Sequence, residues 1–89
     1  MAAKVRPCLV LSIRPGPADR ALLALVPHTS SVQGTAFEMA VPVPFLKPGA
    51  FDAQGLVTVA RPRLIRRLGL LPPAGLASVE TAVRAWLGL

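Results

Sequence analysis

The sequence is short of the residues that bind metal ions or cross-link a chain. It has one cysteine, Cys8, one histidine, His28, and only two Asp and two Glu among 89 residues. One cysteine excludes an intramolecular disulfide and a cysteine-based zinc cluster. The few His, Asp and Glu residues are scattered, so we expect chemistry without a metal or other cofactor. Because Cys8 begins an apolar run, we predict that it is a small core residue.

Long apolar segments are also missing. Hydrophobic residues make up 53% of the chain, but Pro, Arg or His interrupts every run well before the roughly 18 residues that a membrane helix needs. The N-terminus lacks the pattern of a signal peptide. We therefore expect a cytoplasmic protein with a single domain over residues 1–89. A lone domain of this size is only marginally stable, which favours pairing with a second copy.

Acidic residues are few relative to basic ones. Ten Lys and Arg against four Asp and Glu give a net charge of +6, and the pI is near 11.5. Such a charge attracts phosphate backbones or acidic peptides, although solubility alone explains it equally well. The densest charge lies in residues 61–67, which either bind such a partner or form a solvated face. With only four aromatic residues, the chain has little provision for stacking several bases.

Short apolar runs between Pro and Gly residues predict strands. The expected strands are 8–13, 21–26, 37–43 and 55–60. Pro27 is expected to end the second strand, and Pro42 indicates that the third lies at a sheet edge. Residues 44–54 are predicted to be a loop.

The C-terminal segment predicts a helix. Pro72 and Pro73 stand where prolines open helices. The apolar residues then follow a spacing of 3.6 residues on one face: Leu76, Val79, Val83, Trp86 and Leu87. The predicted fold is therefore mainly β with a C-terminal helix, as a small antiparallel barrel or sheet on which the helix packs.

Three segments, in this order, resemble the MazF/PemK family of toxins. Residues 4–12 (KVRPCLVLS) resemble the family signature, in which a basic residue and then Arg-Pro precede an apolar strand that ends in Ser. Residues 26–31 (VPHTSS) resemble the family's Pro-x-Thr-Ser turn, and Gly34 and Phe37-Glu38 follow at the family spacing. Residues 64–89 resemble its basic lead-in, Leu-Pro-Pro turn and closing helix. Each motif alone is weak, but their order over nearly the whole chain is fairly specific.

The resemblance implies an SH3-like barrel, a homodimer, and a type II toxin that cleaves single-stranded RNA without a metal. It also implies neutralisation by an acidic antitoxin. The protein would then contact DNA only indirectly, through this antitoxin. The implied catalytic pair is Arg6 and Thr29. In metal-free cleavage the substrate's 2′-hydroxyl attacks the phosphate, so we interpret Arg6 as a clamp on the developing charge and Thr29 as a hydroxyl donor. Without the resemblance, a surface ion pair and a polar loop explain them better.

Five further residues are candidate RNA contacts by the same resemblance: Lys4, His28, Ser30, Ser31 and Gln54. His28 titrates near neutral pH, but we favour a base-contacting or structural role for it over proton transfer. Family members usually begin with a further strand and loop. We therefore expect that this chain is shortened or that its reading frame starts upstream of Met1, and the missing loop would weaken RNA binding.

Two alternatives remain open. The ending Trp86-Leu87-Gly88-Leu89 is similar to that of gyrase-poisoning toxins of the CcdB type, which share the fold and act by protein contact. The position of Trp86 on the apolar helix face, however, is explained by burial. The other alternative is a catalytically degenerate homologue that binds RNA or antitoxin without cutting.

Overall fold

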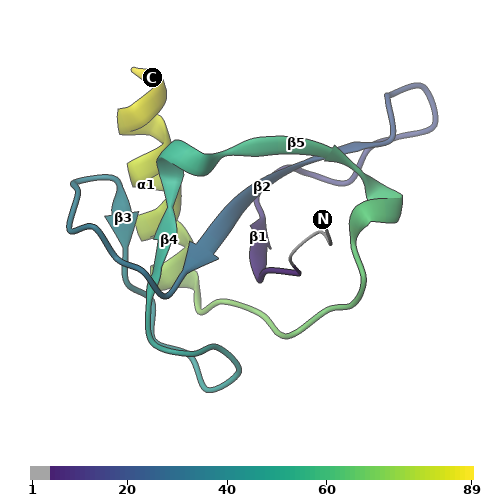
Figure 1. The fold of residues 1–89 in the computed structure, drawn as a ribbon. Helices are drawn as coiled ribbons and strands as arrows, with labels where there is room; N and C mark the ends of the chain where they lie inside the picture. Colours follow the sequence, from purple (N-terminus) through teal and green to yellow (C-terminus); the bar gives the residue numbers. More distant parts are fainter. Residues whose placement is uncertain (1–4) are drawn as a thin grey trace, which may run out of the picture.

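The computed structural model describes residues 5–89, which form five short strands followed by one helix (Figure 1). The strands are β1 (Cys8–Val10), β2 (Leu22–Thr29), β3 (Glu38–Met39), β4 (Ala50–Asp52) and β5 (Val57–Ala60). Two 3-10 turns, η1 (Ala53–Gly55) and η2 (Arg61–Arg63), flank β5, and the helix is α1 (Pro73–Leu87). The predicted class, mainly β with a C-terminal helix, is confirmed. Among the described residues no helix is long and apolar enough to cross a bilayer.

Strand β2 lies at the centre of the sheet, and every pairing is antiparallel. β1 occupies one edge of β2, with Leu9 opposite Val26. β5 and β4 follow each other along the other edge: β5 pairs with the first half of β2, and β4 pairs with its end, where Phe51 lies opposite His28. β3 pairs only with β4. The end of β2 is therefore surrounded by β1 on one side and β4 on the other.

β2 continues through Pro27, where we predicted that it would end. The amide of His28 donates to the carbonyl of Pro7 on the β1 side. Because amides alternate between the two edges of a strand, the Pro27 nitrogen faces the other edge, beyond the end of β5, where no ladder bond is lost. The strand therefore reaches Thr29 and includes the first half of the predicted turn.

The predicted loop 44–54 is wrong at its end, since Ala50–Asp52 forms β4. Ala50 and Phe51 are buried, so their apolar character is used in the core. The predicted strand 37–43 is only two residues long, because β4 offers just Asp52 and Phe51 as partners. β3 does lie at the end of the sheet, while Pro42 lies outside the strand.

Helix α1 packs on one face of the sheet and closes the core. Val79, Ala82 and Val83 are buried against a cluster that includes Val26 and Phe51. The helix begins at Pro73, as the two prolines predicted. It ends at Gly88, whose φ of 72° is left-handed, and the last amides donate back into the final turn. Glycine suits this position because it has no Cβ to clash there.

Two burial predictions need correction. Cys8 is exposed rather than in the core, because β1 directs it to the face that α1 does not cover. Trp86 lies on the apolar side of α1, but it remains 45% exposed. Its ring packs edge to face on Phe37, with centroids 5.4 Å apart and an interplanar angle of 65°. Burial of Trp86 is therefore partial, and the aromatic contact anchors the end of the helix.

Candidate functional site

The register of β1 on β2 places Arg6 across from Thr29. Cys8 pairs with Pro27, and the bond from the His28 amide to the Pro7 carbonyl, 3.0 Å, extends the ladder by one residue beyond the strand. The next pair in the same register is Arg6 and Thr29. Directly opposed residues of an antiparallel pair project on the same face. Two residues that are 23 positions apart in the chain thus meet at one end of the sheet.

The environment of Cys8 shows on which face Arg6 lies. Partial burial raises the pKa of the Cys8 thiol, and the positive charge of Arg6 opposes this by lowering it. Residues two apart on a strand share a face, so the Arg6 guanidinium and the Cys8 sulfur lie on the side away from α1. Arg6 is itself exposed. A cation is therefore held at the surface, on the face to which Thr29 also points.

Thr29 is fixed by a short turn that uses one of its hydroxyl lone pairs. Its Oγ1 accepts a hydrogen bond from the amide of Ser31, at 3.0 Å. A hydroxyl that accepts here still has its own hydrogen to donate. Thr29 is half-buried, whereas Ser30 and Ser31 are exposed. The predicted turn thus presents one oriented hydroxyl donor followed by two accessible ones.

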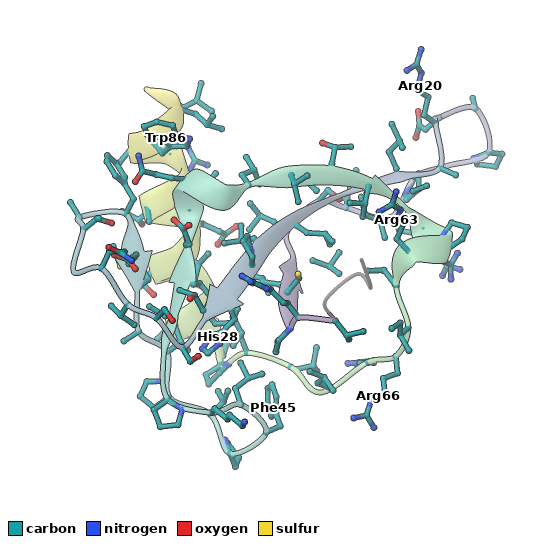
Figure 2. The ribbon with its side chains drawn as sticks, in the orientation of Figure 1. Arg20, His28, Phe45, Arg63, Arg66 and Trp86 are labelled. Atoms are coloured by element: carbon teal, nitrogen blue, oxygen red, sulfur yellow. The ribbon has the colours of Figure 1, made fainter. Side chains whose placement is uncertain are left out.

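His28 lies on the opposite face of β2 from Thr29 and is buried, with 7% of its surface exposed. Its ring packs edge to face on Phe51, with centroids 4.9 Å apart. Burial lowers the pKa of the imidazole, so the ring is neutral near pH 7. Figure 2 shows His28 below the end of β2, beside the loop that carries Phe45. It lines a cavity of about 290 Å³ formed with residues 40–43 and 46–49.

Gln54 lies in η1, on the same side of β2 as β4. The backbone amide of Gln54 donates a hydrogen bond to the carboxylate of Asp52, at 3.1 Å, and this bond caps the turn. The neighbouring Gly55 packs on the ring of Pro27, where a Cβ atom would come within 2.7 Å of the ring. Gln54 is exposed, and the turn that carries it contacts Pro27 through Gly55. This candidate therefore lies on a turn beside β2.

The densest basic segment, residues 61–67, follows β5. In Figure 2, Arg63 lies near the end of β5, away from His28, and Arg66 lies on the segment that runs back below the sheet. Residues 61–70 are all exposed, so this segment is accessible. Lys4, another predicted RNA contact, lies outside the described residues. Within residues 5–89, no group of three His, Cys, Asp or Glu side chains is placed to hold a metal ion.

Sequence reasoning missed Gly49 and Lys47. Gly49 packs so closely on the end of β2 that a Cβ atom there would overlap the carbonyl oxygen of Thr29 and approach His28 Cε1 to 2.8 Å. Lys47 lines the same cavity as His28. Both were placed in the predicted loop 44–54. The only sequence signal was the apolar pair Ala50-Phe51 directly after Pro-Gly, which resembles a turn leading into a strand.

The family of PemK-like, MazF-like toxins of type II toxin-antitoxin systems matches residues 2–87. This chain belongs to that family. The match gives no support to the gyrase-poison alternative.

Solved structures agree with this assignment. MazF in a MazE-MazF crystal structure from Deinococcus radiodurans is similar at 30% identity, with a TM-score of 0.78 over 94% of this chain and 82% of that one. Two others, at 24% identity, share the fold. An endoribonuclease in complex with its cognate antitoxin from Mycobacterial species has a TM-score of 0.81 over 94% and 82% of the two chains. For the Mycobacterium tuberculosis toxin MazF-mt6 the values are 0.76, 94% and 87%. Comparison with curated proteins gave no match.

Proposed function

We propose that this toxin is a metal-independent endoribonuclease that cleaves single-stranded RNA. The observation that carries the proposal is the register that sets Arg6 across from Thr29 at the end of β2. A guanidinium and a hydroxyl on one face supply donors to a single phosphodiester. The family of the chain and the solved endoribonuclease of the same fold support this choice.

In the proposed reaction, the 2′-hydroxyl oxygen attacks the adjacent phosphorus and the bond to the 5′-oxygen breaks. Solvent water takes up the proton that the 2′-hydroxyl loses and supplies the proton that the departing 5′-oxygen gains. The products are a 2′,3′-cyclic phosphate and a 5′-hydroxyl. Negative charge grows on the phosphoryl oxygens in the transition state, and Arg6 donates two charge-assisted hydrogen bonds to them. Thr29 donates its free hydroxyl hydrogen to the same group, since its lone pair already holds the Ser31 amide. A guanidinium has N–H donors and no acceptor, so Arg6 is a clamp rather than a base.

The remaining candidates act on the RNA outside the scissile phosphate. Ser30, Ser31 and Gln54 are exposed beside the end of β2 and offer hydrogen-bonding groups to neighbouring phosphates or base edges. Lys4 precedes Arg6 by two residues and supplies a further positive charge for the backbone. Contacts to phosphates position the RNA, and contacts to the edges of the bases give sequence preference.

We propose a homodimer that uses the sheet face away from α1. Leu25 is buried there, while its cross-strand neighbours Val10 and Val57 are 44% and 46% exposed. Leu64 and Ile65 add exposed apolar surface beyond β5. A second copy that covers this row removes it from water. In size-exclusion chromatography of dilute samples, a Val57→Lys variant should then elute as a monomer while the parent elutes as a dimer. If both proteins elute as dimers, the interface lies elsewhere.

We also propose an acidic antitoxin as partner. The solved structures with this fold include complexes of a toxin with its antitoxin, and the net charge of +6 favours an acidic ligand. The exposed arginines of residues 61–67 suit the acidic side chains of such a protein. Binding there would leave the charge of this segment paired rather than solvated.

The decisive experiment incubates the purified protein with single-stranded RNA in excess EDTA. We expect cleavage with 5′-hydroxyl ends, reduced by about 10²-fold to 10³-fold in Arg6→Ala and strongly reduced in Thr29→Val, each of which removes transition-state donors. Arg84→Ala, which removes an equal charge from the exposed side of α1, is the matched control and should cut like the parent. If the parent leaves RNA intact, or both variants cut normally, the proposed function is wrong.

A further inference from the structure

A cavity lies under the end of β2, on the side of the sheet opposite Thr29. Its volume is about 290 Å³, close to the lower limit for pockets that bind small ligands. Most of its lining is aliphatic or proline ring, and His28 and Lys47 are the two lining residues with polar side chains. The lining residues are His28, Ala40, Val41, Pro42, Val43, Leu46, Lys47, Pro48 and Gly49. The cavity therefore has mostly apolar walls, and its two polar residues are the buried His28 and the exposed Lys47.

His28 is buried, and among the described residues its ring nitrogens have no hydrogen-bond partner. Only 7% of the residue is exposed, and none of the hydrogen bonds among residues 5–89 involves its imidazole. Yet no fully buried side-chain nitrogen or oxygen in this part of the chain lacks a partner. Its ring nitrogens must therefore reach open space, and the space that His28 lines is this cavity. A buried ring that is left unsatisfied is costly unless a ligand or water completes it.

The chemistry of the two polar groups defines what fits. A neutral imidazole presents one N–H donor and one acceptor nitrogen, and the Lys47 ammonium presents donors only. A nucleobase carries adjacent donors and acceptors on its edge and two flat faces. Extruded bases in proteins are held by hydrogen bonds to that edge and by stacking between apolar side chains. An aliphatic side chain from a protein partner would fill the volume but leave His28 unsatisfied.

We propose that this cavity binds one extruded base of the RNA substrate, with His28 and Lys47 reading its edge. The proposal rests on the proposed function, because it names the feature of the substrate that the same end of β2 selects. His28 and Thr29 are adjacent in the chain, and β2 ends at Thr29. The proposal requires that a nucleotide whose phosphate meets Thr29 passes round this end of the strand, outside the contact of Gly49 with the Thr29 carbonyl, and places its base on the other side. The cavity thus selects a nucleotide next to the cleaved bond.

His28 is the only histidine, so its Cε1 proton gives a single resolved signal in a proton NMR spectrum. The probes are the four nucleoside 5′-monophosphates, with ribose 5-phosphate as the control for the phosphate alone. We expect a saturable shift of the His28 signal with one nucleotide binding at least several-fold tighter than the rest. Ribose 5-phosphate should produce no comparable shift. The experiment needs no catalysis, so it is independent of whether the protein cuts RNA.

Two variants test the polar groups. Lys47→Met keeps the aliphatic stem and loses the ammonium, and it should weaken the preferred nucleotide about tenfold, as for one charged hydrogen bond. Arg84→Met loses the same charge on the far side of α1 and should bind like the parent. If the two variants weaken binding equally, long-range charge explains it and the proposal fails.

The remaining outcomes are also decisive. A His28 signal that all four nucleotides leave unchanged overturns the base pocket, even if the parent cleaves RNA. Equal shifts with ribose 5-phosphate overturn it as well, since a phosphate alone would then suffice. Shifts with a leucine-rich acidic peptide and none with nucleotides assign the cavity to a protein partner instead. A base-specific shift in a protein that does not cut RNA would retain the pocket and discard the nuclease.

Discussion

Gly49 and Thr29 touch backbone to backbone, and a Cβ atom at position 49 would overlap the carbonyl oxygen of Thr29. The same added atom would lie 2.8 Å from His28 Cε1. Position 49 therefore fixes how closely the loop before β4 approaches the end of β2. Because that approach sets both the proposed phosphate contact and the proposed base pocket, a small change here should affect two functions together.

We predict that Gly49→Ala destabilises the protein by about 2 kcal/mol, since the strand end and the loop must move apart to admit the methyl group. RNA cleavage should fall along with stability. The measurement is urea unfolding at pH 7, with cleavage assayed at a temperature where both proteins are folded. Gly16→Ala is the control, because its added Cβ would meet only a flexible Asp19 carboxylate at 3.3 Å. Equal stability of Gly49→Ala and the parent would show that the contact is looser than described.

Glu38 holds the loop that follows the proposed active-site turn. Its carboxylate accepts amide hydrogen bonds from Gln33 at 2.8 Å and from Thr35 at 2.7 Å. These bonds lower the pKa of Glu38 from its ordinary value of 4.5. A lowered pKa means that the folded state releases the proton more readily, so this stabilisation is present above pH 4.5 and is lost as the pH falls through the folded value.

We therefore predict that Glu38→Gln is less stable than the parent at pH 7 and that the two converge below the folded pKa of Glu38. Unfolding midpoints in urea at several pH values give the comparison. Glu80→Gln is the matched control, since Glu80 is exposed on α1 and should show little difference at any pH. A constant gap between Glu38→Gln and the parent across the whole range would contradict the role of the charged form.

His28 gives the fold a second pH dependence, in a different range. Burial lowers the pKa of the folded imidazole below its ordinary value of 6.5. The unfolded chain thus takes up a proton first, and stability is lost as the pH falls from 6.5 towards the folded value. We predict that this decline disappears in His28→Phe, which retains a ring against Phe51. Urea titrations between pH 7.5 and 5 measure it, above the range in which Glu38 titrates, and an unchanged decline in the variant would assign it to other groups.

The sequence predicted most of what depends on local pattern. The helix start at Pro73 and the strands around Leu9 and Leu23 each follow from spacing and from Pro or Gly punctuation. It failed where tertiary contacts decide. Pro27 signals a strand end, yet its missing amide faces an edge without a partner, so β2 continues. The apolar run at Cys8 indicates burial, but only one face of β1 meets the core.

The residues of the candidate site also fall into two groups: those that the sequence predicted and those that only tertiary contacts reveal. The resemblance supplied Arg6 and Thr29 as a pair, and the register of β1 on β2 supplies a physical reason for their proximity. No local pattern could show that Lys47 and Gly49, in a segment read as loop, would line a cavity with His28. That cavity exists because β4 pairs with the end of β2 and draws the preceding loop under it. Such a relation depends on contacts across the fold, which a single sequence does not reveal.

Trp86 has either a structural role in the fold or a role in contact with a partner protein, and its substitution distinguishes the two. It is 45% exposed and packs edge to face on Phe37, near the end of α1. We predict that Trp86→Ala lowers stability by about 2 kcal/mol, less than the 3 to 5 kcal/mol of a fully buried Trp, because part of the ring already contacts water. Trp86→Phe should recover most of the loss.

RNA cleavage by Trp86→Ala, measured at a temperature where the variant is folded, should equal that of the parent, since Trp86 lies on α1, away from the Arg6 and Thr29 end of the sheet (Figure 2). The matched measurement is DNA gyrase activity in the presence of each protein. If the parent inhibits gyrase and Trp86→Ala does not, the exposed part of the ring is a partner contact, and the gyrase-poison alternative would gain the support that it lacks. Unaffected gyrase with both proteins would leave Trp86 with the structural role that its contact with Phe37 indicates.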